Sequence, residues 1–183
     1  MPRIVDHDAQ RAELLDKAFP LFADRGYGGV TMRGLAKALG VSTGTLYHYF
    51  SGKPDIFGQM LGHLAERDIA AVEAAIEPDD SVEKRLEALS VWLQSEAPRL
   101  RRVLLLSLDA WQLDPDADSR ATLTRTSRLY RETLTDRLAL PPELGTLLYS
   151  FVLGALVHET LDGEAGELAP QLALIRGLLG NLS

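Results

Sequence analysis

Side chains with hydroxyl groups and aromatic rings gather between Ser42 and Phe50. Thr43 and Tyr47 are four residues apart, so in a helix they lie on the same face. Leu46 and Phe50 have the same spacing and form an apolar face that points inward. Hydroxyl groups and backbone N–H groups donate hydrogen bonds to phosphate oxygens. The pattern therefore predicts a short helix that packs through one face and presents polar groups suited to phosphate on another.

Charged residues are unevenly distributed around this segment. The chain of 183 residues has 19 Lys and Arg against 26 Asp and Glu, a formal net charge of −7 that argues against a polyanionic partner. Positions 25–54, however, hold four basic residues and no acidic one, so their net charge is +4 and that of the other 153 residues is −11. This asymmetry favours a polyanion-binding face within positions 25–54, with an ordinary mixed surface as the alternative.

Groups that could form a catalytic or metal site are sparse. The chain has no cysteine, which excludes a disulfide, a thiolate zinc site and a cysteine nucleophile. Its four histidines, His7, His48, His63 and His158, are not spaced as ligand pairs on one helix face. The sequence also lacks a glycine-rich phosphate loop and a serine nucleophile elbow. We therefore expect no catalytic residue, no metal, no cofactor and no enzymatic activity.

Apolar residues recur with helical spacing along the whole chain, and no segment alternates as a strand would, so the sequence predicts an all-α fold. Two short helices joined by a glycine-containing turn at Gly40 form a helix-turn-helix pattern, with Thr31 and Ser42 as their N-caps. The expected helices cover residues 8–25 with a kink at Pro20, 32–39, 42–50, 54–76, 82 up to a break at Pro98, 99–113, 118–138, 143–161 and 167–181.

The segment GYGGVTMRGLAKALGVSTGTLYHYFSGKPDIF, residues 26–57, strongly resembles the DNA-binding segment of TetR-family transcriptional regulators. The resemblance covers about residues 8–65, and many spaced positions agree at once. Beyond residue 65 only the number and lengths of the helices fit that family. The resemblance implies an N-terminal three-helix domain with a helix-turn-helix, residues 1–53, and a C-terminal helical domain for ligand binding and dimerisation, residues 54–183.

The resemblance also implies which residues meet DNA. The helix Ser42–Phe50 would be the recognition helix in the major groove, with Thr43, Thr45 and His48 as candidates for base readout. Phosphates would be met by Tyr47 and Tyr49, by Thr31 at the cap of the second helix, and by Lys53 at the start of the fourth. The expected DNA-binding set is Thr31, Ser42, Thr43, Gly44, Thr45, Tyr47, His48, Tyr49 and Lys53.

The helix expected at 143–161 is apolar nearly all round between Leu147 and Val157, which predicts burial on more than one side. The last two helices together have more apolar surface than one small core needs, so we expect a homodimer interface there. A compact monomer with a central buried helix is the alternative. The expected interface residues are Leu148, Val152, Leu156, Leu168, Leu172, Ile175 and Leu179.

Aromatic, methionine and polar residues in the second part of the chain could line a ligand cavity, or they could simply pack in a core. The family resemblance favours a cavity, and the apolar composition favours an apolar or amphipathic ligand. The candidate residues are Met60, Trp92, Asp109, Trp111, Tyr130, Tyr149, Phe151 and His158.

Together these patterns predict a homodimeric regulator that binds double-stranded operator DNA, most simply a repressor released by a small-molecule effector. The alternative is an all-helical binding or interaction protein that no longer binds DNA, as the acidic total would allow. The polar start of the chain does not resemble a signal peptide, and the charge-free run of 15 residues from Leu144 to His158 is shorter than a membrane span. We therefore expect a cytoplasmic protein without a membrane partner.

Overall fold

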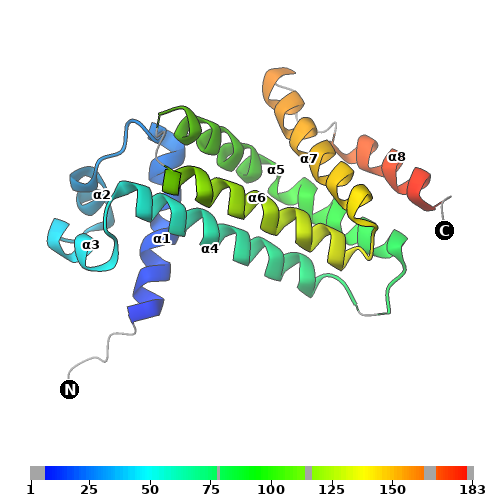
Figure 1. The fold of residues 1–183 in the computed structure, drawn as a ribbon, viewed down its shortest axis with the longest axis horizontal. Coiled ribbons are helices and arrows are strands. Elements are labelled where there is room, and N and C mark those ends of the chain that lie inside the picture. Colours follow the sequence, from blue (N-terminus) through cyan, green and yellow to red (C-terminus); the bar gives the residue numbers. More distant parts are fainter. Residues whose placement is uncertain (1–6, 78, 114–116, 163–167, 181–183) are drawn as a thin grey trace. The chain divides into compact units, whose positions relative to one another are not determined.

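The chain is helical throughout the part that the structure describes, which is residues 7–77, 79–113, 117–162 and 168–180 of a computed structural model (Figure 1). The all-α prediction is confirmed, since no strand occurs in these ranges. The helices are α1 His7–Arg25, α2 Met32–Leu39, α3 Thr43–Tyr49, α4 Lys53–Ala74, α5 Val82–Leu113, α6 Ala117–Arg137, α7 Pro142–Asp162 and α8 Leu168–Gly180.

The predicted break at Pro98 is wrong, because α5 runs without interruption through that residue. A proline inside a helix leaves the carbonyl four residues earlier without its usual N–H donor. Here both Pro98 and Gln94 are exposed, so water can reach that carbonyl. Leu93 and Ala97, each next to one of these residues in sequence, are buried, so this stretch of α5 is held by packing as well as by backbone hydrogen bonds.

The helices form two compact units. Unit 1 comprises the described residues within 1–66 and 103–126, and unit 2 comprises those within 67–102 and 127–183. Helices α4, α5 and α6 each begin in one unit and end in the other. The boundary expected at 53/54 coincides with the start of α4, but packing groups the first half of α4 with the N-terminal helices. As a functional boundary it stays a prediction.

The core of unit 1 explains this grouping. Phe22 of α1, Leu46 of α3 and Met60 of α4 are completely buried. The ring of Phe57 contacts those of Phe22 and Tyr27, with ring centroids 5.5 and 5.0 Å apart. The first half of α4 therefore supplies apolar surface that the three short N-terminal helices need for a stable core.

The loop between α1 and α2 is held against α5 within unit 1. Asp109 Oδ2 accepts a hydrogen bond from the Tyr27 N–H at 2.7 Å, and Lys53 Nζ donates to the Tyr27 carbonyl at 3.1 Å. Gly26 has a φ of 70°, which ends α1 in the left-handed region that glycine adopts without strain. A Cβ at Gly28 would lie 2.9 Å from a methyl carbon of Leu113.

Unit 2 packs around leucines from the first half of α5 and from α7. Its α6 and α7 lie close together at Gly145, where an added Cβ would collide with Thr135 Oγ1 and lie 3.0 Å from the backbone of Thr135. Buried apolar residues of this unit include Leu86, Leu89, Leu93, Leu138, Leu148, Val152, Leu156 and Leu172. Glu159 of α7 is also buried and pairs with Arg101 at 3.7 Å.

The close approach at Gly145 predicts a large effect of a small substitution. Gly145→Ala should lower the free energy of unfolding by about 1–3 kcal/mol, because the new methyl group collides with the α6 backbone. Gly62→Ala is the control, since no atom lies within 4 Å of a Cβ added at that helical position. It should be neutral or stabilise by up to about 1 kcal/mol. Thermal melts by circular dichroism measure both, and equal melting temperatures for the two variants would contradict the prediction.

Candidate nucleic-acid interface

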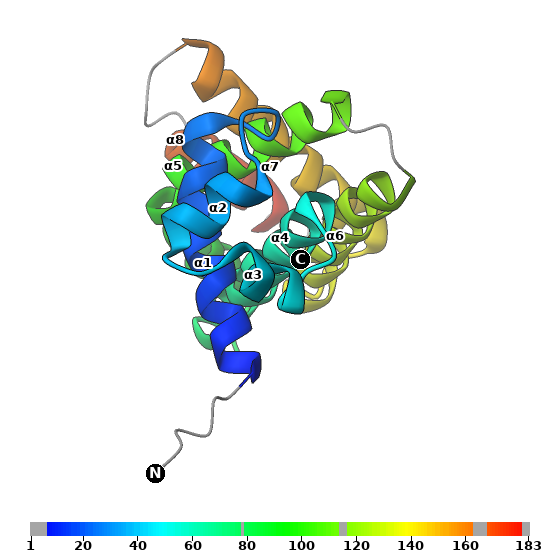
Figure 2. The same cartoon turned by 90° about the vertical axis from the view of Figure 1, so that its left-hand side faces the viewer.

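Helices α2 and α3 are capped at both ends, which confirms the predicted helix-turn-helix (Figure 2). The hydroxyl of Thr31 accepts from the Gly34 N–H at 3.1 Å, and that of Ser42 accepts from the Thr45 N–H at 2.9 Å. Gly40 ends α2 with a φ of 71°, a left-handed conformation suited to glycine. The capping is local, so the sequence pattern was sufficient to predict it.

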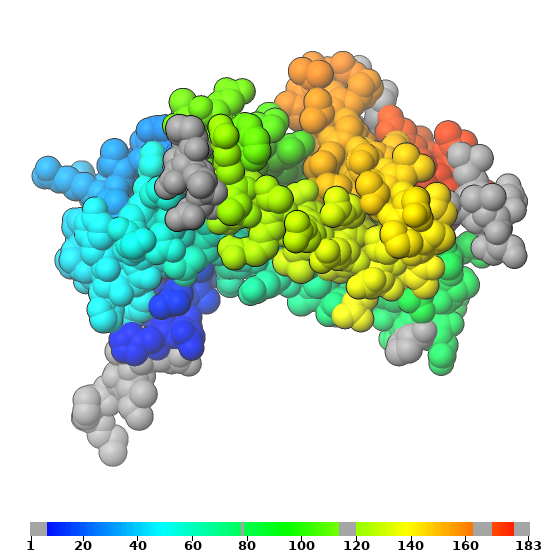
Figure 3. Space-filling view, in the orientation of Figure 1, coloured from blue at the N-terminus to red at the C-terminus, as the bar shows by residue number. Residues whose placement is uncertain are grey.

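The outward face of α3 carries the polar groups expected from the sequence. Ser42, Thr43, Gly44 and His48 are exposed, and Thr45 is half-buried beside Ser42. Tyr47 is 53% exposed, a high value for a large aromatic side chain. Leu46 and Phe50 lie in the core of unit 1, as predicted. Figure 3 shows α3 (cyan) at the surface of the molecule.

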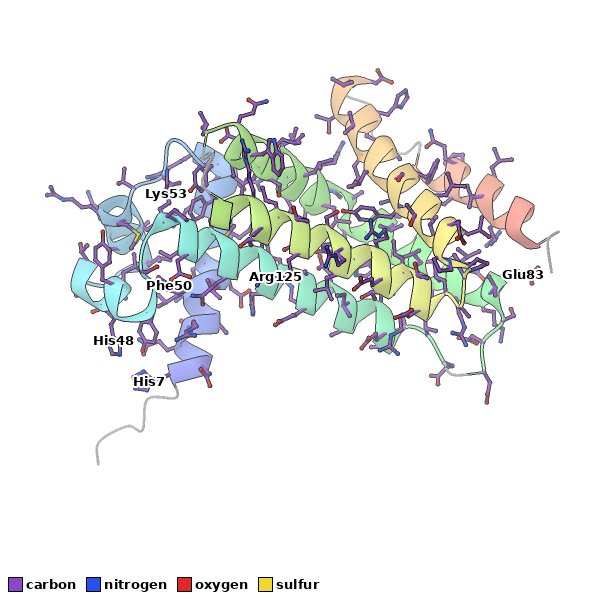
Figure 4. All side chains as sticks on the ribbon, in the orientation of Figure 1. His7, His48, Phe50, Lys53, Glu83 and Arg125 are labelled. Atoms are coloured by element: carbon purple, nitrogen blue, oxygen red, sulfur yellow. The ribbon has the colours of Figure 1, made fainter. Side chains whose placement is uncertain are left out.

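Tyr49 packs against α1, and its expected contact with a phosphate stays a prediction. It is 9% exposed, and its hydroxyl donates to Gln10 Oε1 at 2.6 Å and lies 3.3 Å from His7 Nδ1. The ring of His48 stands edge-on to that of Tyr49, and His7 lies near both from the start of α1 (Figure 4). Tyr49 therefore holds α3 against α1. Because Gln10 is 39 positions away, helical spacing alone could not have indicated this contact.

Lys53 is half-buried and has partners within the protein. Its ammonium group donates to the Tyr27 carbonyl and lies 4.1 Å from the centroid of the Tyr27 ring, a cation–π contact. An ammonium has three donors, so these contacts leave capacity for an oxygen of another molecule. Thr31, the other expected phosphate ligand outside α3, is exposed.

Two basic residues of α2 were not among the expected site residues. Arg33 and Lys37 are four positions apart on one helix face, and both are exposed. Arg25 at the end of α1 is exposed as well. The signal that could have identified them is the absence of acidic residues between positions 25 and 54. Basic residues in such a stretch are suited to a polyanion.

The acid-free stretch ends at Asp55, which stabilises the start of α4. Its carboxylate accepts from the Ser51 N–H at 2.7 Å and from Gln59 Nε2 at 2.8 Å. Partial burial raises the pKa of Asp55, but the hydrogen bonds from Gln59 and Ser51 outweigh it and leave the pKa below its ordinary value. The aspartate is therefore engaged in helix capping.

The expected ligand-pocket residues are divided between the two units. Met60, Asp109 and Trp111 belong to unit 1. Met60 is completely buried in the core, Asp109 accepts from Tyr27, and Trp111 is 46% exposed under the guanidinium of Arg120. Each of these three side chains has a structural contact or faces solvent, and their part in a ligand pocket stays a prediction.

The other five expected pocket residues belong to unit 2. The Tyr130 hydroxyl donates to Asp68 at 2.7 Å, and the Tyr149 hydroxyl donates to Ser127 at 3.0 Å. His158 is half exposed, and its Nε2 lies 3.0 Å from Asp162. Trp92 and Phe151 are half-buried. Asp68 of α4, which the sequence did not indicate, is buried and accepts hydrogen bonds from side chains of α5 and α6.

The expected dimer-interface residues are largely internal. Leu148, Val152, Leu156 and Leu172 are only 2–7% exposed within the single chain, so they pack inside unit 2, and their part in an interface stays a prediction. Ile175 is half-buried, and the side chains of Leu168 and Leu179 lie outside the described residues. Because α7 is apolar nearly all round, its sequence could not indicate which stripe packs inside. The exposed apolar residues of α7 and α8 are Leu147, Val157, Leu161 and Leu174.

Two further features bear on other classes of function. Within the described ranges no group of three or more His, Asp or Glu residues is arranged to hold a metal ion. Helix α7 is long and apolar enough to cross a membrane by length and composition, and a third of its apolar window is buried inside the protein. Soluble proteins commonly contain such helices.

Comparison with known proteins agrees with this geometry. Residues 14–60, which include α2 and α3, match the family described as bacterial regulatory proteins, tetR family. The HTH-type transcriptional repressor KstR2 of Rhodococcus jostii is 30% identical over 156 residues, covering 85% of this chain and 67% of that protein. The HTH-type transcriptional regulator UidR of Escherichia coli is 25% identical, covering 92% and 88%. The regulator BetI of Rhizobium meliloti is 30% identical, and the chain spans 62% of its length.

Solved structures share the fold. Reduced NemR of Escherichia coli has a TM-score of 0.77 at 22% identity, covering 91% of this chain and 95% of that one. The fatty acid degradation regulator FadR of Bacillus halodurans has a TM-score of 0.73 at 17% identity, covering 98% and 96%. With the capped helix-turn-helix, the family match and the repressor KstR2 in agreement, this chain belongs to the TetR family of DNA-binding transcriptional regulators.

Proposed function

We propose that the protein is a cytoplasmic, homodimeric repressor that leaves its operator when a small apolar or amphipathic ligand binds unit 2. The observation that carries the DNA-binding part is the exposed polar face of α3 on a capped and buried scaffold. KstR2 supports repression, since it is a transcriptional repressor. FadR of Bacillus subtilis, whose structure was solved with stearoyl-CoA, supports an effector with an apolar chain.

In this proposal α3 lies in the major groove. Thr43, Thr45 and His48 are the candidates for base readout. Tyr47, Thr31 and the free donor capacity of Lys53 would meet phosphates, with Gly44 allowing close approach of the backbone. We add Arg33 and Lys37 of α2 to this set, because both are exposed and positively charged. Phosphate contacts set the register of the protein on DNA, and the few base contacts select the sequence.

We infer that a second copy of the chain covers the exposed apolar face of α7 and α8. Leu147, Gly154, Val157 and Leu161 follow one another at steps of seven, three and four residues, so they share one face of α7. Leu174 of α8 is 66% exposed. A two-fold dimer would place two recognition helices about 34 Å apart, or a multiple of that distance, on a pseudo-palindrome.

Helices α4 and α5 would carry the ligand's effect to the DNA-binding segment, because both continue from unit 2 into unit 1. Asp109, near the end of α5, accepts a hydrogen bond from the Tyr27 N–H. Lys53, at the start of α4, donates one to the Tyr27 carbonyl. A ligand that shifted either helix would therefore alter the loop that precedes α2. Such a ligand needs different affinities for the two arrangements of the dimer.

The exposed hydroxyl of Tyr47 gives the first test of DNA binding. Tyr47→Ala should weaken operator binding by about tenfold, as expected for loss of one hydrogen bond to a charged group, and should leave the melting temperature unchanged. Tyr47→Phe separates the hydroxyl from the ring. Gel shifts would use the operator found by selection from random duplexes. Unchanged affinity in both variants would rule out Tyr47 as a contact, and no binding by the unaltered chain would favour the non-DNA-binding alternative.

Arg33 and Lys37 give a test that depends on charge. Each phosphate contact contributes about −0.9 to the slope of log K against log salt concentration. Arg33→Ala and Lys37→Ala should each make that slope shallower by about 0.9 and weaken binding to all sequences alike. Arg128→Ala, an exposed arginine of α6, is the control and should leave the slope unchanged. If the salt dependence of binding has the same slope in all three variants, α2 does not contact the DNA phosphates.

The proposed dimer face can be tested by introducing charge where the chain is already exposed. Leu147→Arg and Leu174→Arg should each shift the protein to monomers in sedimentation velocity without lowering its helix content, because a charge would be buried in the interface. Val91→Arg, on an apolar position of α5 that is 64% exposed, is the control. Dimers that persist in both interface variants would overturn this assignment.

A further inference from the structure

A buried polar cluster joins three helices inside unit 2. Asp68 of α4 is only 3% exposed. Its Oδ1 accepts from Arg99 Nη2 of α5 at 2.5 Å, and its Oδ2 accepts from the Tyr130 hydroxyl of α6 at 2.7 Å. Arg99 Nε also donates to Glu96 Oε2 at 2.6 Å. Both carboxylate oxygens of Asp68 and two of the three guanidinium nitrogens are thus engaged.

The third guanidinium nitrogen has no partner. Among the described residues, Arg99 Nη1 is the buried side-chain nitrogen or oxygen without a hydrogen-bond partner. A buried N–H group that lacks an acceptor is destabilising, and native structures rarely retain one without a reason. The side chain is 17% exposed as a whole and is fixed by two ion pairs, so Nη1 cannot turn away to find water. The cluster is therefore complete except for one acceptor at a defined place.

The surrounding charges restrict which acceptor fits there. Two carboxylates, Asp68 and Glu96, already pair with the guanidinium of Arg99, and the exposed Arg67 is a further positive charge that acts on Asp68. A third negative charge beside them would be repelled in this low-dielectric interior, and a cation has no lone pair to accept the N–H. An uncharged oxygen, such as the carbonyl of a ketone, ester or amide, accepts the hydrogen bond without adding charge. Trp92, seven residues before Arg99 on the same face of α5, supplies apolar surface nearby.

We propose that Arg99 Nη1 is the polar anchor of the effector site and takes an uncharged carbonyl oxygen of an otherwise apolar ligand. This inference rests on the proposed ligand response of unit 2 and specifies the chemical class of the ligand. In this role Arg99 selects against fatty acid anions and pure hydrocarbons alike. The carboxylates of Asp68 and Glu96 hold the guanidinium in position, and Tyr130 holds Asp68.

Three naphthalene dyes of similar size distinguish the ligand classes. Prodan is an uncharged ketone, N-phenylnaphthylamine is uncharged and lacks oxygen, and anilinonaphthalene sulfonate is an anion. Binding would be followed in the full chain by quenching of Trp92, after Trp111→Phe has made it the sole tryptophan. We expect Prodan to bind more tightly than either of the other dyes.

The variant Arg99→Lys keeps a positive charge for Asp68 but removes the third guanidinium nitrogen. It should raise the Kd for Prodan by about tenfold and shift the emission of bound Prodan to the blue, because its carbonyl loses a hydrogen bond. The Kd for N-phenylnaphthylamine should stay within about twofold. Arg101→Lys, in the same helix, is the matched control and should change neither value.

Each other outcome would count against the inference. If Prodan binds the unaltered chain and Arg99→Lys equally, Arg99 does not bind an uncharged carbonyl oxygen. The same conclusion follows if the sulfonate is the dye whose binding depends on Arg99. In both cases the proposed ligand response of unit 2 still stands. If no dye quenches Trp92 in the unaltered chain, the ligand response of unit 2 itself fails. Should Arg99→Lys not fold, the double variant Asp68→Asn, Arg99→Gln removes both charges together and is tested in the same way.

Discussion

The backbone N–H and the backbone carbonyl of Tyr27 both form hydrogen bonds with side chains from other helices. Asp109 of α5 accepts from its N–H, and Lys53 at the start of α4 donates to its carbonyl. The ring of Tyr27 is buried against Phe57, so the loop before α2 cannot move independently of α4 and α5. Two of the three helices shared by both units, α4 and α5, thus contact the same residue of the helix-turn-helix segment. In the proposed ligand response, this residue is where a shift of α4 or α5 would reach the helix-turn-helix.

The recognition helix depends on its surroundings for stability. A helix of seven residues does not form in water by itself, because nucleation fixes several residues for a single hydrogen bond. Leu46, Phe50 and the ring of Tyr49 bury its inner side, and Ser42 caps its first turn. With that side fixed, Thr43, Tyr47 and His48 are presented outward in a defined arrangement. The same packing that stabilises α3 therefore orients the groups that we propose to meet DNA.

The core of unit 2, unlike the apolar core of unit 1, contains a network of buried polar side chains. Apolar residues dominate its core, yet Asp68, Arg99 and Tyr130 place a network of buried polar groups within it. Burial raises the pKa of Asp68, although the Tyr130 hydroxyl and the Arg99 guanidinium oppose that shift. Burial also raises the pKa of Tyr130, and the nearby Asp68 adds to the effect, so the hydroxyl stays protonated as a donor. A buried ion pair is weak evidence for stability, and its value here lies in the orientation that it gives to Arg99.

The sequence by itself determined the helix-turn-helix, its caps and the inner face of α3, because these depend on spacings of three and four residues and on hydrogen bonds within one turn. It also indicated the basic stretch and the family. Only the tertiary structure decided that Tyr49 turns inward to Gln10, that α5 continues through Pro98, and which stripe of α7 is buried. Asp109 and Tyr27 are 82 positions apart, and Asp68 and Tyr130 are 62 apart. Such partners are chosen by the packing of whole helices, which no local pattern contains.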